Sequence, residues 1–241
     1  AAPTRPEANA QWMDLGVLLF ILLPVVSSLA RRILGRKLGT LATGGAAGDD
    51  VFIEDLSGGV QVNLISAGTG SVQLSSVLGI SENSDAAADI TAGALTLDAG
   101  GPITLDTTVT SVDISTSAAG NVDIDETDAI VLSDVDTSDG AVTVDAGGQI
   151  TATDVDSSAT DDDSNDISLT STGAGIEAQS IIAGSSNDVT LDAQGGSITE
   201  NGDAGVDVTA DVLTADAAGS VTLDTTVASA DISTSAAGDV D

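Results

Sequence analysis

The sequence predicts an all-β fold, a parallel β-solenoid (β-helix) whose turns, or rungs, each take about 20–27 residues. A short apolar helix is expected before it. Three observations predict the solenoid: a long internal duplication, a shorter spacing of apolar residues within it, and a near absence of aromatic side chains. Stacked rungs bury their apolar faces against each other, so their narrow interior needs no large side chains.

The duplication has an offset of 118 residues. Residues 80–123 match residues 198–241 at 30 of 44 positions, and the octet DISTSAAG is identical at 113–120 and 231–238. An enzyme seldom needs its active-site neighbourhood twice, whereas a chain built from copies of one structural unit does. Because the second copy runs to the last residue, we expect this chain to be a fragment of a longer array.

The shorter spacing is marked by eight apolar anchors, each two residues after a turn-forming residue. The anchors are Val72, Leu95, Val122, Val142, Ile167, Val189, Leu213 and Val240. Their intervals are 23, 27, 20, 25, 22, 24 and 27 residues. Five consecutive intervals make up the offset of the duplication, which predicts that the long unit contains five rungs.

Each predicted rung contains two or three short strands. Apolar and polar residues alternate after each anchor, as in a strand with one face turned inward. A second apolar position follows eight or nine residues after the anchor, often across a glycine-rich corner such as DAGGPI (98–103). A third apolar cluster, less regular, completes the rung.

The aromatic residues are Trp12, Phe20 and Phe52, so the core after Phe52 must be aliphatic. A β-sandwich is the alternative fold, but its hairpins would require more two-residue Asn-Gly or Asp-Gly turns than the chain contains. Disorder is a second alternative for so acidic a chain. The alternating Val, Ile and Leu residues argue against it.

Charge divides the chain into two parts. All five basic residues lie in the first 37 positions, and residues 38–241 contain 36 acidic residues and no basic one. This balance excludes nucleic acid and anionic membrane surfaces as partners of the second part. It favours cations as partners, or a high-salt medium, although a soluble, anti-aggregating surface explains it equally well.

We expect three segments: a membrane- or export-related segment with a basic flank (1–37), a Gly/Ala-rich linker (38–50) and the repeat region (51–241). Residues 15–30 are apolar, and counted from Met13 the stretch reaches 18 residues, the short end of a membrane-spanning helix. The basic cluster follows at 31–37, so the positive-inside rule would keep the repeats cytoplasmic. Membrane contact is expected only through residues 13–37.

Three explanations of this segment remain open. It is an anchor (residues 13–30) for repeats that face inward, an unusual export signal processed near LATGGAAG (41–48), or a mis-assigned reading frame at this end of the chain.

The composition excludes several kinds of catalysis. Without His or Cys, imidazole bases and thiol nucleophiles are absent, and the lack of Cys also excludes disulfides. A glycosidase needs only a pair of carboxylates. Close aspartates are common in a chain this acidic, however, so we expect no enzyme and no catalytic residue, and a glycan hydrolase is the least favoured function.

Calcium is the candidate cofactor. Its candidate ligands lie three residues after an anchor: Asp98, Asp125, Asp145, Asp192 and Asp216. Stacked rungs would place these carboxylates about 4.8 Å apart, where neighbours repel by about 1 kcal/mol in water. Bridging Ca²⁺ ions would relieve that repulsion. The alternative is that these aspartates end strands and solvate the surface.

The stretches GALTLDAGGPITLDTTV (93–109) and NDVTLDAQGGSITENG (187–202) resemble very large bacterial surface proteins built of β-strand repeats. These are the filamentous-haemagglutinin-like adhesins and autotransporter passenger domains, and the resemblance covers about residues 51–241. It implies an adhesive or stalk-like fibre that is secreted or at the cell surface, with host or neighbouring-cell glycans or proteins as partners. The expected function is therefore a non-enzymatic structural or adhesive repeat region, and the alternative is a calcium-binding extracellular matrix module.

Overall fold

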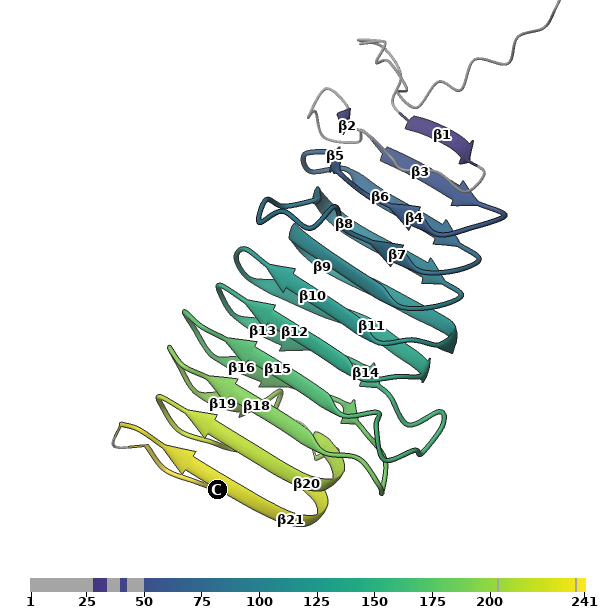
Figure 1. Ribbon diagram of the computed structural model, residues 1–241. Helices are drawn as coiled ribbons and strands as arrows, with labels where there is room; N and C mark the ends of the chain where they lie inside the picture. The colour runs from purple at the N-terminus through teal and green to yellow at the C-terminus, as the bar shows by residue number, and fades with distance from the viewer. Residues whose placement is uncertain (1–27, 34–39, 43–49, 203, 237) are drawn as a thin grey trace, which may run out of the picture.

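The computed structural model describes residues 28–33, 40–42, 50–202, 204–236 and 238–241. These residues form a parallel β-solenoid of about nine turns (Figure 1). Every strand pairing in it is parallel and joins one rung to the next. The predicted fold class is confirmed.

The rungs are built from 21 strands. In chain order they are β1 (Ser28–Ile33), β2 (Thr40–Ala42), β3 (Asp50–Asp55), β4 (Val60–Gln61), β5 (Leu64–Ser66), β6 (Ser71–Ser76), β7 (Ile80–Ser81), β8 (Ile90–Ala99), β9 (Ile103–Ala119), β10 (Val122–Glu126), β11 (Ile130–Asp139), β12 (Val142–Ala146), β13 (Ile150–Ala152), β14 (Val155–Asp156), β15 (Ile167–Ser171), β16 (Ile176–Ala178), β17 (Ile181–Ile182), β18 (Val189–Ala193), β19 (Ile198–Glu200), β20 (Val208–Ala217) and β21 (Thr225–Thr234).

The core is one continuous aliphatic cluster that extends along the whole stack. Its members are Val, Ile, Leu and Ala, and Phe52 lies outside it with 37 % of its surface exposed. The expected aliphatic core is therefore confirmed. Alternation along each strand places every second side chain inside, as in β12, where Val142, Val144 and Ala146 are buried.

Buried hydroxyl groups hold several corners between strands. Ser76 Oγ donates to the carbonyl of Gly58 (3.0 Å), Thr137 Oγ1 to that of Gly140 (2.6 Å) and Ser171 Oγ to that of Gly148 (2.7 Å). These bonds satisfy carbonyls that leave the strand ladder where the chain turns.

The corners also bring backbone segments of successive rungs into close approach. A Cβ atom added at Gly100 would lie 2.1 Å from the carbonyl oxygen of Val77 in the preceding rung. Glycine is therefore required at this corner for steric reasons.

Apolar residues stack in columns along the solenoid. The first column contains Val60, Ile80, Ile103, Val122, Val142, Ile167, Val189 and Leu213. The second contains Val51, Val72, Leu95, Val112, Leu132, Ala152 and Ala178. The third contains Ile130, Ile150, Ile176, Ile198, Val221 and Val240.

The eight anchors do not share one column, as their common spacing suggested. Val72 and Leu95 lie in the second column, the next five anchors in the first, and Val240 in the third. The cause is an additional strand within each 27-residue interval. Val112 stacks on Leu95 after only 17 residues, so the chain passes one more side before it reaches the next anchor.

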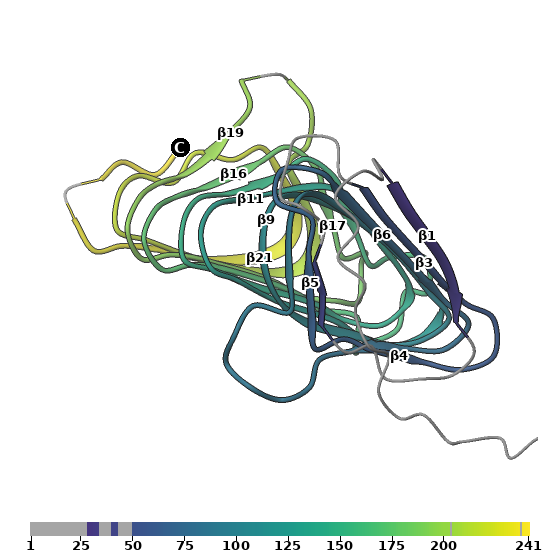
Figure 2. The same cartoon turned by 90° about the horizontal axis from the view of Figure 1, so that it is seen from above.

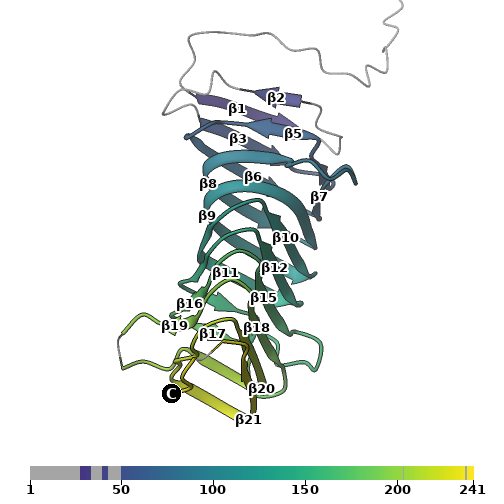
Figure 3. The same ribbon diagram turned by 90° about the vertical axis from the view of Figure 1, so that its left-hand side faces the viewer.

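The long unit is therefore not a whole number of rungs. Five turns of the first column lead from Ile80 to Val189, and Ile198, the copy of Ile80, follows nine residues later in the third column. The prediction that the 118-residue unit contains five whole rungs was therefore wrong, because the unit contains five rungs and one further strand. Figures 2 and 3 show the result: the loop between β7 and β8 and the loop between β19 and β20 project from different sides of the stack.

The apolar helix, the basic flank and the linker expected at the N-terminus lie mostly outside the described residues. Ser28–Ile33, where the predicted helix passes into the basic flank, form strand β1, which pairs with β3. Thr40–Ala42 form β2 and pair with β5. Within the described part of the chain, no helix is long and apolar enough to span a membrane.

Candidate cation sites

The first candidate site is the row of aspartates expected from the sequence. Asp125, Asp145, Asp192 and Asp216 do lie in one row, with Thr170 between the second and the third. Asp106 extends the row beyond Asp125. We call these six residues the aspartate ladder.

Asp98 does not belong to the ladder. It lies on β8, one of the strands that carry the second apolar column, and its neighbours in register are Ser75 and Ser115. Asp98 is separated from the other four candidates because its anchor, Leu95, lies in the second column, whereas Val122 and the anchors of the other candidates lie in the first.

The carboxylates of the ladder act on each other. Burial raises the pKa of Asp125, and the charges of Asp106, Asp123 and Asp145 raise it further. Other members have local partners: Gln194 Nε2 donates to Asp192 Oδ2 (2.8 Å), and the hydroxyl of Ser233 donates to Asp216. The ladder is therefore a strongly negative, solvent-facing row rather than an enclosed binding site.

A second group of carboxylates was not foreseen. Glu82 follows β7, Asp89 precedes β8, and Asp106 lies in β9. One carboxylate oxygen from each of the three lies within 4.8 Å of the others. Loop 82–89 leaves the solenoid at β7 and returns at β8, and this return brings the three groups together. We call them the carboxylate triad.

Asp89 is the central member of the triad and is completely buried. Its backbone N–H donates to the carbonyl of Asp106 (2.7 Å), and the N–H of Asp106 donates to Asp89 Oδ2 (3.2 Å). The other oxygen, Oδ1, is buried and has no hydrogen-bond partner among the described residues.

Burial raises the pKa of Asp89 to about 6. The hydrogen bond from Asp106 opposes this rise, and the charges of Asp106, Glu82 and Asp85 add to it. A carboxyl group with a raised pKa is also what a glycosidase uses as its acid. Asp89 has no exposed surface, however, so a glycan oxygen has no access to it.

The loop that carries the triad is held by its own polar groups. Asp85 N–H donates to Asn83 Oδ1, Ala87 N–H donates to Asp85 Oδ1 (both 2.9 Å), and Asn83 Nδ2 donates to Asn63 Oδ1 in the neighbouring rung. These bonds give the loop a defined path from Glu82 to Asp89.

The duplication contains the same residues again at Glu200, Asp207 and Asp224. The hydrogen bonds are repeated as well: Asp207 N–H donates to the carbonyl of Asp224, and Asp224 N–H donates to Asp207 Oδ2, both at 2.7 Å. All seven acidic residues of 80–123 are retained in 198–241, although 14 of the 44 positions differ. Because all seven are retained alike, the sequence gives no signal that singles out the triad, and among the described residues only the first copy brings its three carboxylates within 4.8 Å of one another.

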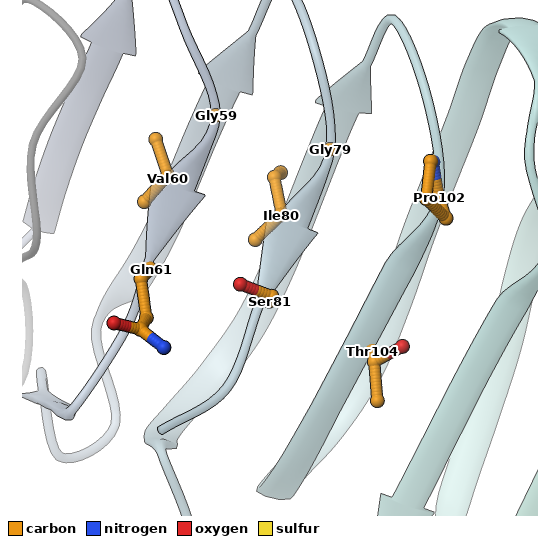
Figure 4. Close-up of a pocket in the computed structure, with 8 residues that line it drawn as sticks. All are labelled: Gly59, Val60, Gln61, Gly79, Ile80, Ser81, Pro102 and Thr104. Carbon is orange, nitrogen blue, oxygen red and sulfur yellow. The ribbon is translucent and has the colours of Figure 1, made fainter. Parts of the chain in front are cut away.

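One shallow hollow lies on the surface near these rungs. Figure 4 shows its lining, with Val60, Ile80 and Pro102 on successive rungs and Gln61, Ser81 and Thr104 beside them. Among the described residues, its lining contains no carboxylate and no basic side chain.

The chain matches no protein-family model, no curated protein and no solved structure. What the structure supports of the resemblance to bacterial repeat proteins is the β-solenoid fold itself.

Proposed function

We propose that residues 51–241 form a non-enzymatic structural or adhesive rod within a large bacterial cell-surface or secreted protein. The observation that carries the proposal is the unbroken stack: parallel ladders join each rung to the next from β3 to the C-terminal bridge of Val240. Backbone pairing at about 4.8 Å per rung gives nine turns a length of roughly 40 Å. Such a stack is stabilised by its neighbour contacts and is suited to spacing other parts of a protein.

The outer surface fits the same role. Residues 51–241 carry many acids and no base, so rods of this kind repel one another and stay dispersed. The outward positions are mainly Thr, Ser and Asp, as in the pattern of β9. Adhesion would then depend on a polar surface offered repeatedly along the rod, with glycans or proteins of other cells as partners.

Small-angle X-ray scattering on the chain, and on versions with one or two additional copies of the 118-residue unit, tests the rod. Five turns and one further strand per unit predict an increase in length of about 25 Å per copy at constant cross-section. A particle that grows in width instead would contradict the proposal. Binding of coated beads to cells or to a glycan panel then separates an adhesive rod from a passive spacer.

A second candidate function is a calcium-binding matrix module, and the aspartate ladder is the observation that favours it. Carboxylates on successive rungs with no nearby base attract divalent cations. Thermal melts followed by circular dichroism, with calcium and with chelator, test this function. A melting temperature indifferent to calcium would exclude it.

A further inference from the structure

Loop 82–89 places negative charge where the fold gives it no compensation. Three carboxylates approach one another at its base, and no basic residue exists anywhere in residues 38–241. Most acids of this chain face water, but Asp89 does not. An ionised carboxylate buried with one oxygen unpartnered is costly unless another group compensates it.

We propose that Glu82, Asp89 and Asp106 bind one calcium ion. The site shares Asp106 with the aspartate ladder but adds Glu82 and the buried Asp89, and it does not depend on whether the rod is structural or adhesive. Its ligand is a divalent cation that takes oxygen donors.

The spacing of the triad fits such an ion. Calcium binds carboxylate oxygens at about 2.3–2.6 Å, so two oxygens on opposite sides of one ion lie roughly 4.6–5.2 Å apart. The oxygens of the triad lie within 4.8 Å of one another. A single ion between them therefore requires little movement of the three side chains.

The buried oxygen of Asp89 is the second and independent observation. Oδ2 accepts the N–H of Asp106, while Oδ1 has no hydrogen-bond partner among the described residues and is shielded from water. A bound cation would give this buried carboxylate a partner and would offset the charges of the three acids.

The donor set selects the kind of metal. All three side chains offer oxygen, and the chain has no His or Cys to supply nitrogen or sulfur, which disfavours zinc and copper. Magnesium demands near-ideal octahedral geometry and gives up its waters reluctantly, whereas calcium accepts variable geometry with six to eight oxygens. Calcium therefore fits a site formed by a loop and a strand.

Binding would fasten the loop to the rung. Glu82 and Asp89 lie at the two ends of the loop, while Asp106 belongs to β9 in the solenoid wall. An ion shared by all three would tie both ends of the loop to the wall.

Isothermal titration of calcium chloride into the full chain at about 0.15 M NaCl tests the site, because this salt concentration screens diffuse binding to the acidic surface. The test variant is Asp89→Asn. The control is Asp98→Asn, at an exposed aspartate outside both the triad and the ladder, which loses the same charge.

We expect one tight site in the unchanged chain and a loss of at least tenfold in its affinity in Asp89→Asn. The control should retain this site. Hydrogen–deuterium exchange supplies a second readout: calcium should slow exchange in residues 83–90 of the unchanged chain but not of Asp89→Asn.

Two results would overturn the proposal. One is a titration of Asp89→Asn that superimposes on that of the unchanged chain, and the other is a control that loses as much binding as Asp89→Asn. If Asp89→Asn fails to fold, Glu82→Gln at the half-buried edge of the triad replaces it. None of these outcomes alters the rod length measured by scattering, so the two proposals fail separately.

Discussion

Replacing Asp89 by Asn should stabilise the protein when calcium is absent. Asn has the same shape and retains an oxygen to accept the N–H of Asp106, but it carries no charge. Its amide N–H groups would replace the buried oxygen Oδ1, in a site that also holds the carboxylates of Glu82 and Asp106. The substitution thus removes an unfavourable buried charge and adds donors in its place.

The size of the effect follows from the pKa of Asp89, which rises from 3.8 to about 6 on folding. The folded state therefore binds a proton more tightly than the unfolded state, and the stability contributed by this group decreases as pH rises from about 4 to about 6. At 1.36 kcal/mol per pKa unit the upper limit is about 3 kcal/mol. Solvent that reaches Glu82 and Asp106 screens part of this, which leaves about 1–2 kcal/mol.

Urea unfolding in EDTA, followed by circular dichroism, measures this difference between the variant and the unchanged chain. The two should have similar stability near pH 4, where both groups are neutral, and the variant should be more stable by about 1–2 kcal/mol near pH 7.5. Acids remote from Asp89 contribute equally to both proteins and cancel in the difference. A variant that is less stable at the higher pH, or a difference that does not change with pH, would refute the reasoning.

Three further predictions concern the stack itself. Ile150→Ala removes a fully buried side chain and should cost about 2–5 kcal/mol in urea unfolding, whereas Leu78→Ala, at a side chain 57 % exposed, should change stability by less than about 0.5 kcal/mol. Gly100→Ala should lower the melting temperature through the close approach to Val77, at a cost of about 1–3 kcal/mol. Gly101→Ala, whose Cβ would meet its nearest atom at 3.4 Å, should be tolerated, and equal effects at the two glycines would contradict the stacking at this corner. Raising NaCl from about 10 mM to about 100 mM shortens the Debye length from about 30 Å to about 10 Å and should raise the melting temperature, because the repeat region carries only negative charge; a melt unaffected by salt would show that repulsion does not limit stability.

The solenoid could be predicted because its causes are local. Alternation along each short strand, glycine at the corners and an aliphatic interior are visible in any single rung, and the strands formed where these patterns occur. The stacking register could not be predicted in the same way. A loop that bulges outward and a strand that occupies an additional side both lengthen the interval between anchors, and the count of residues does not distinguish them. The 24-residue interval from Val189 to Leu213 is one turn of the solenoid that includes an outward loop. The 27-residue interval from Leu95 to Val122 is more than one turn, because Val112 already stacks on Leu95 and one further strand precedes Val122.

The candidate site was predicted in part for the same reason. Asp125, Asp145, Asp192 and Asp216 share one stretch of constant register and do lie in one row, while Asp98 precedes the change of register and does not. The carboxylate triad depends on how loop 82–89 folds back onto the neighbouring rung. Its spacing in the sequence carries no metal motif, and the retention of its acids in the second copy is shared by every other acid of the duplicated stretch.

The length of the duplicated unit determines on which side of the solenoid each copy of a given segment lies. Because one unit takes five turns and one further strand, a loop of one copy leaves the rod on a different side from the same loop of the next copy. A flat partner surface that meets the first copy is then out of reach of the second. Tandem duplication in this protein therefore places repeated surfaces on different sides of the rod. One rod can then hold separate partners on separate sides, whereas a single flat partner gains no avidity from the second copy.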